Sequence, residues 1–414
     1  MSKNTIKHKA IIFNCSYNGL SIIQDLGKQG ISCIALDYER SIGTYSKYSK
    51  YIKCPDPMVN ETMFIKFLYE LCKKEPHKPV LFPTNDHWAM AISKHYKMLQ
   101  EVSYLCVPRY PLVETLIDKE KFASTYQDKG FLLPKSWDYI SIQNDSEISF
   151  PIIAKPKYRR ISGNNNKSKK LSVHLDKLRI SYINNEKELN QYCVKHSNIL
   201  NLILFQKYIH GISDTMYTIG IYANQKHDVI RMFCGKKRRG FPADIGDCII
   251  GENYSPPKHI IENTIRMVKT IQFHGIAEFE YKKDSLTNEF SLIEINPRSW
   301  SWVGITKKCN VNIPVSAYYD LIGVPVSYKD SLHIPNQSIF YIKILQDFTN
   351  CLWAYKNDYK PWQISFNSWL KEFNLIKTNA VIAEFNNKDY LISIIAIIKA
   401  FKRIIKLLIL KAYN

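Results

Sequence analysis

The chain has 414 residues, of which 45% are hydrophobic and 23% are charged. These values are ordinary for a globular protein and allow a substantial core, and the length predicts two to four structural units. The formal net charge is +20. Such a charge permits binding to nucleic acid, to an anionic membrane or to anionic substrates such as nucleotides, although scattered Lys and Arg can also reflect biased composition.

The ten cysteines show no C-x-x-C spacing, so the sequence predicts neither a zinc site nor a disulfide framework. Reduced thiols are typical of the cytosol. The first residues, MSKNTIKHKAIIF, lack the apolar core of a signal peptide. No apolar run is long enough for a transmembrane helix, which needs about 18 residues. We therefore expect a cytoplasmic protein.

The first part of the chain alternates strands and helices. The segment KAIIFN predicts a strand, LSIIQDLGKQG a helix that closes on Gly30, and ISCIALD a second strand that ends in Asp37. After the second strand, SIGTYSKYSKYIKCPDP predicts a polar loop, and two more strands follow in PVLFPT and VSYLCVP. Four strands alternating with helices predict a doubly wound α/β domain with ligands at the strand ends. The first turn has only one glycine, Gly19, which excludes a dinucleotide fingerprint.

The apolar strand FPIIAKPK carries Lys155. A lysine in such a strand needs a partner, which phosphate oxygens would supply, unless it reaches water at the strand edge. Residues 157–178 are poor in apolar side chains and predict a basic loop that could cover an anion. A nucleic-acid groove would need interleaved aromatic side chains, and this stretch has only Tyr158, so no specific nucleic acid is expected.

Four consecutive cations, Lys236 to Arg239, follow a predicted strand and precede a Gly/Pro turn. Charge runs are usually solvated. The position before the turn also allows these side chains to be held over a pocket, where arginine can bind a carboxylate or phosphate in a bidentate way.

The stretch from Ile276 to Gly304 predicts two strands joined by a polar turn. Residues two apart share a face of a strand, so Glu278 and Glu280 point one way, as do Glu294 and Asn296. If the strands pair, acids and an amide oxygen converge, with Arg298 one step beyond. Such hard oxygen ligands suit Mg²⁺. The alternative is an edge hairpin with solvated acids.

The last 25 residues predict a strongly apolar helix in which Lys399, Lys402, Arg403 and Lys406 cluster. Residues 391–414 could lie on an anionic membrane surface, which would place the protein at the inner face of the membrane. They could equally pack on their own domain or on a partner subunit, as in a homodimer.

Three motifs, in this order along the chain, resemble those of the ATP-grasp superfamily. They are the lysine strand IIAKP, the strand and connector ILFQKYIHG, and the acidic hairpin that ends in EINPR. The resemblance is to the carboxylate–amine ligase-like group, near D-aspartate ligase and the ATP-grasp domains of carbamoyl-phosphate synthetase. It implies a pre-ATP-grasp α/β domain over 1–116, a two-lobed ATP-grasp domain with lobes 117–212 and 213–326, and a helical extension over 327–414.

The resemblance also implies roles for residues that match the family's motifs. It assigns metal binding to Glu280, Glu294 and Asn296, nucleotide binding to Lys155, Lys177, Gln206, Lys207, Tyr208, Ile209 and Asp214, and contacts with the terminal phosphates and acyl substrate to Arg298, Arg239 and Lys237. This chain departs from the family at two places. Lys207 stands where an acid is usual, and an Asn/Lys-rich stretch with the single glycine Gly163 replaces a glycine-rich loop.

The implied function is that of an ATP-dependent carboxylate–amine ligase that uses ATP with Mg²⁺ or Mn²⁺. In this chemistry a carboxylate attacks the γ-phosphate and an amine then displaces phosphate from the acylphosphate. The product would be an amide or peptide bond on a small molecule or a cell-surface precursor. Two alternatives remain: an ATP-binding module without ligation, and a basic membrane-associated protein that uses the fold as a scaffold.

Overall fold

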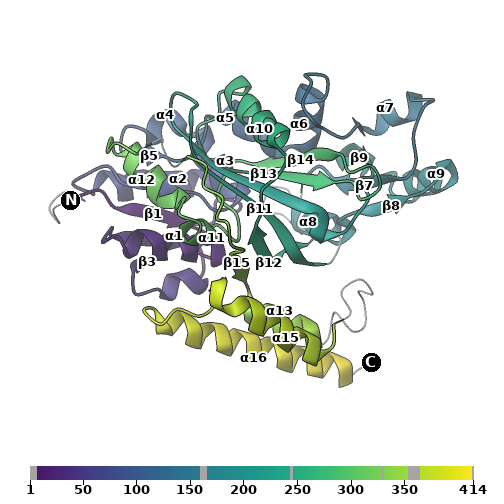
Figure 1. Ribbon diagram of the computed structural model, residues 1–414. Helices are drawn as coiled ribbons and strands as arrows, with labels where there is room; N and C mark the ends of the chain where they lie inside the picture. Colours follow the sequence, from purple (N-terminus) through teal and green to yellow (C-terminus); the bar gives the residue numbers. More distant parts are fainter. Residues whose placement is uncertain (1–6, 159–165, 243–245, 328–330, 353–363, 413–414) are drawn as a thin grey trace.

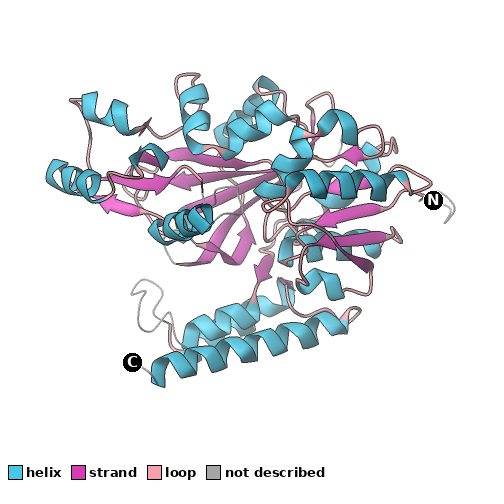
Figure 2. Ribbon diagram, turned by 180° about the vertical axis from the view of Figure 1, so that it is seen from behind, coloured by secondary structure: helices cyan, strands magenta, loops and turns pink. Residues whose placement is uncertain are grey.

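The computed structural model describes residues 7–158, 166–242, 246–327, 331–352 and 364–412. Within these residues the strands form three sheets of five, four and seven strands (Figures 1 and 2). Helices cover the sheets, and the last helices form a separate layer at one edge of the molecule.

The five-stranded sheet is parallel throughout, with the order β3-β2-β1-β4-β5. Its strands are β1 (Ala10–Phe13), β2 (Cys33–Asp37), β3 (Ser49–Lys53), β4 (Val80–Phe82) and β5 (Tyr104–Leu105). The helices are α1 (Tyr17–Gly27), α2 (Glu61–Lys73), α3 (Asp86–Lys94), α4 (Tyr96–Leu99) and α5 (Tyr110–Ile117), with the 3-10 turn η1 (Ile42–Tyr45). The predicted α/β alternation is confirmed. The prediction of a loop over 41–57 was wrong at β3, an edge strand whose side chains are at most half buried and therefore show no apolar signal.

The four-stranded sheet is antiparallel, with the order β6-β9-β7-β8. Its strands are β6 (Ser136–Trp137), β7 (Ile152–Pro156), β8 (Ser181–Ile183) and β9 (Ile203–Lys207). The surrounding helices are α6 (Lys119–Tyr126), α7 (Tyr139–Asn144), α8 (Asn166–Leu178) and α9 (Glu186–Lys195), with the 3-10 turn η2 (Leu200–Leu202).

The prediction of a basic loop over 157–178 was wrong for most of its length, because α8 occupies it from Asn166. Four lysines give this stretch the composition of a solvated loop, yet Leu171, Leu175 and Leu178 recur at helical spacing and belong to the core of this sheet. Residues 159–165, which include Gly163, lie outside the described residues.

The seven-stranded sheet has the order β14-β13-β10-β11-β12-β15-β16. Each of the first five strands is antiparallel to its neighbours in this order: β14 (Phe290–Asn296), β13 (Gly275–Lys283), β10 (Met216–Ala223), β11 (Val229–Phe241) and β12 (Asp247–Asn253). The helices α10 (Lys258–Thr270), α11 (Ile305–Lys308) and α12 (Ile313–Leu321) and the turn η3 (Ser213–Thr215) accompany them. The four consecutive cations do not follow the strand, as the sequence predicted, but lie within it, because β11 continues through them to Phe241.

One core joins this sheet to the N-terminal sheet. Ala10 and Ile12 of β1 belong to the same buried cluster as Trp300, Trp302 and Tyr341. The segment after β14 therefore packs against the N-terminal unit. This contact fixes where the end of the acidic hairpin lies relative to α3.

The C-terminal part contributes both strands and helices. β15 (Phe340–Ile342) and β16 (Ala380–Ile382) extend the seven-stranded sheet. The helices are α13 (Ile344–Leu352), α15 (Phe366–Ile376) and α16 (Tyr390–Ala412), with the turn η5 (Lys377–Asn379). In Figure 1, α16 lies along the outer edge of the molecule beside α13 and α15.

Within the part of the chain that the structure describes, none of the helices combines the length and the apolar character that crossing a bilayer requires.

Candidate functional site

The two strands of the acidic hairpin pair as the sequence predicted. Glu280 lies directly opposite Glu294, and Glu278 lies opposite Asn296. Residues directly opposite in an antiparallel pair share a face, so the four side chains lie on one side of the sheet. Phe279 points to the other side, into the core beneath α10. The hairpin therefore presents a compact set of oxygen atoms on one face.

A β-bulge in β14 changes which residues of this strand lie on the acidic face. Glu280 pairs with Glu294 and Tyr281 pairs with Leu292, so Ile293 is the extra residue. Strict alternation would put Leu292 and Glu294 on the same face. The bulge instead lets Leu292 pack in the core while Glu294 and Ile293 line a cavity.

This cavity, of about 210 Å³, is lined by residues of the four-stranded sheet and of the seven-stranded sheet. Seven residues that the sequence assigned to the site line it: Lys155, Gln206, Lys207, Tyr208, Ile209, Glu280 and Glu294. Its apolar lining includes Ile153, Leu175, Ile180, Met216, Phe241 and Ile293. The cavity thus combines carboxylates, an apolar lining and a buried lysine. This combination suits a ligand with both a flat apolar part and an anionic part.

Lys155 is buried at 6% exposure, and its ammonium donates to the Gln206 amide oxygen at 2.8 Å. Gln206 in turn donates to the Ser136 hydroxyl. Burial, followed by the nearby charge of Lys119, lowers the pKa of Lys155 to about 7, against a smaller opposing effect of Glu294. An anion bound in the cavity would therefore stabilise the charged form of this lysine.

Glu278 is more deeply buried than its neighbours on the acidic face. It accepts from the Thr218 hydroxyl at 3.0 Å and from the Asn296 amide at 3.2 Å. Burial, followed by the negative charge of Glu280, raises the pKa of Glu278 to about 8. Two carboxyl groups this close cannot both ionise easily without a cation between or beside them.

Arg298 connects the hairpin to the N-terminal unit. Its Nε donates to Asp86 Oδ1 of α3 at 2.7 Å, and its Nη2 donates to Asn296 Oδ1 at 2.9 Å. Burial opposes the charge, but Asp86 and Glu278 raise the pKa of Arg298 above its usual value. The guanidinium is therefore held beside the acidic face by partners from two units of the chain.

Lys237 reaches the same face from β11. Its ammonium lies 3.5 Å from Glu280 Oε1 and 3.5 Å from the Gly246 carbonyl oxygen. Burial works against the charge, but Glu280 and Glu278 raise the pKa of Lys237. Lys237 and Glu280 are therefore an ion pair at the acidic face of the hairpin.

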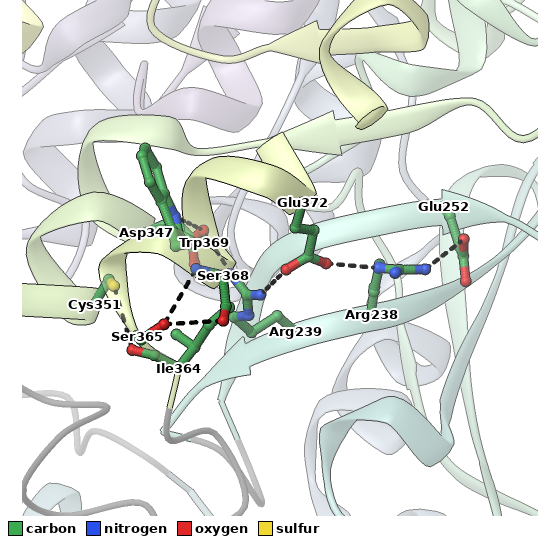
Figure 3. A network of polar contacts seen from close by, with 10 residues as sticks. All are labelled: Arg238, Arg239, Glu252, Asp347, Cys351, Ile364, Ser365, Ser368, Trp369 and Glu372. Carbon is green, nitrogen blue, oxygen red and sulfur yellow. Dashed lines mark hydrogen bonds and ion pairs between the residues drawn. The ribbon is translucent and has the colours of Figure 1, made fainter. Parts of the chain in front are cut away.

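Arg239 does not follow Lys237 onto that face. Lys237 pairs with Gly251 and Arg239 pairs with Ile250, so Arg238 is the extra residue of a bulge. Because of the bulge, Arg238 and Arg239 both face Glu372 of α15, as Figure 3 shows.

Arg239 belongs to a network of ion pairs and hydrogen bonds between β11 and the C-terminal helices (Figure 3). Arg239 Nη1 donates to Asp347 Oδ2 at 2.7 Å, and Trp369 Nε1 donates to the same oxygen at 2.8 Å. Arg238 Nε donates to Glu372 Oε1 at 2.9 Å. The acids come from α13 and α15, so this network fastens the C-terminal helices to β11.

Six of the thirteen assigned residues do not line the first cavity. Lys237, Asn296 and Arg298 lie beside the acidic face of the hairpin, and Arg239 pairs with the C-terminal helices. The other two lie elsewhere. Lys177 is exposed on α8. Asp214 is exposed in η3 and lines a second, highly charged cavity of about 310 Å³ together with Lys236 to Arg239, Glu252 and Glu372.

Sequence reasoning missed three cations that line the first cavity: Lys119, Arg179 and Lys282. A signal existed for Lys282, since it lies two residues after Glu280 in the same strand and therefore shares its face. Arg179 follows the last residue of a helix that the sequence did not predict. Lys119 begins α6, and nothing in the local pattern marks it.

Among the described residues, no group of three or more His, Cys, Asp or Glu side chains is arranged to hold a metal ion. The assigned metal set is of another kind, with two carboxylates and one amide. Asn296 donates its amide hydrogens to Glu278 and Glu294, while its oxygen accepts from Arg298. Two opposed carboxylates with an amide oxygen beside them fit Mg²⁺ or Mn²⁺ by donor chemistry, since these ions commonly take one or two carboxylates plus phosphate oxygens.

Several solved structures share this architecture. The L-amino acid ligase from Bacillus licheniformis has a TM-score of 0.60 at 14% identity, over 81% of this chain and 80% of that one. The N5-carboxyaminoimidazole synthetase from Staphylococcus aureus has a TM-score of 0.60 at 16% identity, over 86% and 88%. Biotin carboxylase from Campylobacter jejuni has a TM-score of 0.60 at 16% identity, over 82% and 76%. The chain has the ATP-grasp fold, as the resemblance in its sequence predicted.

Within that fold, the sequence is similar to a D-aspartate ligase from Enterococcus faecium (strain Aus0004). The two are 24% identical over 273 residues, which are 61% of this chain and 62% of the relative. The match therefore spans less than two thirds of the relative's length. No protein-family model matches the chain. The likeness supports the carboxylate–amine ligase-like group, to which the three motifs pointed.

Proposed function

We propose that the protein is an ATP-dependent carboxylate–amine ligase that acts through an acylphosphate. The observation that carries the proposal is the register of the acidic hairpin. Glu280 lies opposite Glu294 in the lining of the cavity, while Lys155 and the connector Gln206 to Ile209 line the same cavity. A nucleotide needs an apolar slot for its base, a cation for its phosphates and acids for its metal ion, and these residues offer all three.

The roles of the nucleotide-binding residues follow from this arrangement. In our proposal the backbone of residues 206–209 binds adenine and Lys155 binds the α- and β-phosphates. Asp214 was the candidate contact for the ribose, but it lines the second cavity instead. Lys177 was the candidate for a second phosphate lysine. Arg179 lines the cavity and is the better candidate for that role.

The first chemical step would be attack by a carboxylate oxygen of the substrate on the γ-phosphorus of ATP. ADP leaves, and the phosphoryl group becomes the acylphosphate. Glu280, Glu294 and Asn296 would hold Mg²⁺ or Mn²⁺, which when bound neutralises charge on the β- and γ-oxygens. Lys237 and Arg298 would balance the negative charge that develops on the γ-phosphoryl group.

In the second step the amine attacks the acyl carbon and phosphate leaves, which forms the C–N bond. The protein's part in both steps is to hold the reactants in line and to exclude water, which can supply much of the rate enhancement. Arg239 was also a catalytic candidate. Its pairing with Asp347 and Glu372 supports a different role, as an anchor for the C-terminal helices.

The substrates would be a small carboxylate and a small amine. The similarity to D-aspartate ligase makes D-aspartate and related amino acids the first compounds to try. We propose a cytoplasmic location, because the reaction consumes ATP, with peripheral contact at the inner face of the membrane.

The test is ADP release by the full chain across a panel of carboxylates and amines that includes D-aspartate, with detection of the product by mass. Glu294→Gln removes one charge from the acidic face and should lower ADP release at least about 100-fold. Glu289→Gln is the matched control, because Glu289 is exposed at the turn end of the same hairpin. Full turnover in Glu294→Gln would refute the metal assignment, and nucleotide binding without any product would favour a non-ligating ATP-binding module.

A further inference from the structure

The last helix, α16, is fixed to the rest of the protein along one face. Ile392 and Ala396 are buried against Leu20 and Ile42 of the N-terminal unit. Just before the helix, buried Asp389 accepts hydrogen bonds from the Ser46 hydroxyl and the Lys47 backbone amide. The helix therefore has a definite orientation and presents its opposite face outward.

That outward face is apolar. Seven large side chains recur at intervals of one to four residues, each between 38% and 71% exposed: Tyr390, Leu391, Ile394, Ile397, Ile398, Phe401 and Ile405. At 3.6 residues per turn they fall within one third of the helix circumference. We call this face the apolar stripe. Figures 1 and 2 both draw α16 at the outer edge of the molecule, where the stripe is accessible.

The charges on α16 are of one sign. Its 23 residues include five Lys or Arg and no Asp or Glu. Lys402 is exposed at one border of the stripe, and Lys399 is exposed about 60° further round the helix on the same side. Arg403 lies on the packed side, where it donates to Asn350 of α13. The exposed face therefore combines a wide apolar strip with a basic border.

We propose that the apolar stripe docks on an anionic membrane surface, with α16 parallel to the bilayer. An apolar face with a basic border is the pattern of helices that lie in the interface, where lipid tails take up the apolar side chains and anionic headgroups attract the cations. Tyr390 at the start of the stripe is typical of residues at the headgroup level. A second copy of the chain is a less suitable occupant, because it would bring its exposed Lys399 and Lys402 close to those of the first.

This inference stands apart from the ligase proposal, because no residue of the stripe lines either cavity. The test uses the full chain and sedimentation with two kinds of vesicle, one of phosphatidylcholine alone and one with an equal part of phosphatidylglycerol. The chain should sediment with the anionic vesicles, and added salt should reduce the bound fraction.

The double variant Ile394→Glu/Phe401→Glu removes two side chains from the middle of the stripe and should reduce binding more than tenfold. Its matched control is Val194→Glu/Leu286→Glu, which makes the same type of change at two exposed apolar residues far from α16 in the sequence. The control should bind as the wild type does. Lys399→Gln and Lys402→Gln should each reduce binding to anionic vesicles about fivefold, since a cation near such a surface contributes about 1 kcal/mol.

Circular dichroism of both double variants verifies that they fold. Failure of the wild type to bind anionic vesicles would overturn the proposal, and so would equal binding by the stripe variant and its control. If the wild type is instead a dimer that the stripe variant dissociates, with no binding to vesicles, the stripe is an interface between two copies and the membrane proposal is wrong. ADP release measured in solution is expected to be the same for both double variants.

Discussion

The cavity and the network on β11 are both rich in charge, but they differ in how their charges are matched. In the network, Arg239 is paired with two carboxylates, and Trp369 donates a hydrogen bond to one of them. In the cavity, Lys155 donates to a neutral amide, and Glu280 lies beside the buried carboxyl group of Glu278. The network therefore holds two parts of the fold together without a ligand. The cavity keeps charges that a ligand with the opposite charges would stabilise.

The largest effect on stability should come from the network. Asp347→Asn keeps the shape and the hydrogen bond to Trp369 but leaves Arg239 with one acid fewer. Removing one partner of a buried ion pair lowers the free energy of unfolding by about 3 to 5 kcal/mol. Because Glu372 remains as a partner of Arg239, urea unfolding should show a decrease near the lower of these values. The double variant Arg239→Met/Asp347→Leu should regain much of the loss. An unchanged stability in Asp347→Asn would mean that the network does not fasten the C-terminal helices.

Removing a charge from the cavity should weaken ligand binding without lowering the stability of the ligand-free protein. Lys155→Met should weaken ATP binding about 100-fold, because a buried cation that meets a phosphate contributes several kcal/mol. Without a ligand, the same variant should be at least as stable as the wild type at neutral pH, because a buried ammonium opposes folding. Calorimetric titration with ATP and urea unfolding measure the two effects. Lys195→Met on the exposed face of α9 is the control.

The stability of the ligand-free protein should also depend on pH through Lys155. Its pKa is about 7 in the folded chain, against about 10.4 for an unfolded lysine. Between these two values the unfolded chain binds more protons, so stability rises with pH, by at most about 1.4 kcal/mol per pH unit from this group. Lys155→Met should remove this contribution. Parallel slopes in the two proteins, measured by urea unfolding between about pH 7.5 and about pH 9, would contradict the burial of a charged group there.

The smallest effect concerns the second cation for the phosphates. Arg179 lines the cavity and Lys177 does not. Arg179→Gln should weaken ATP binding about tenfold, the effect of losing one partly exposed charge-assisted contact, and Lys177→Gln should leave it unchanged. The reverse result would restore Lys177 to the role that the sequence suggested.

The sequence predicted the fold and the acidic hairpin well, because both depend on local patterns. Apolar strands between helices mark the N-terminal sheet, and alternation places Glu278 with Glu280, and Glu294 with Asn296, on one face of each strand. The sequence could not predict the bulges. One extra residue at Arg238 turns Arg239 toward the C-terminal helices, and this shift depends on how β11 and β12 pair.

The sequence also could not predict contacts between distant parts of the chain. Asp86 binds Arg298 across more than 200 residues, and Glu372 binds Arg239 across more than 130. No local pattern links such residues. Helix α8 was missed for a different reason: its four lysines suggested a solvated loop, although Leu171, Leu175 and Leu178 show the apolar period that identifies a helix.

The central claim is that a substrate carboxylate attacks the γ-phosphorus of ATP in the cavity. The most direct measurement uses the carboxylate that releases most ADP in the panel, labelled with ¹⁸O in its carboxyl group, together with its amine partner. The account predicts that one ¹⁸O atom appears in each phosphate released, because the oxygen that attacks leaves with the phosphoryl group. Phosphate without ¹⁸O, formed at the same rate as the amide product, would contradict it.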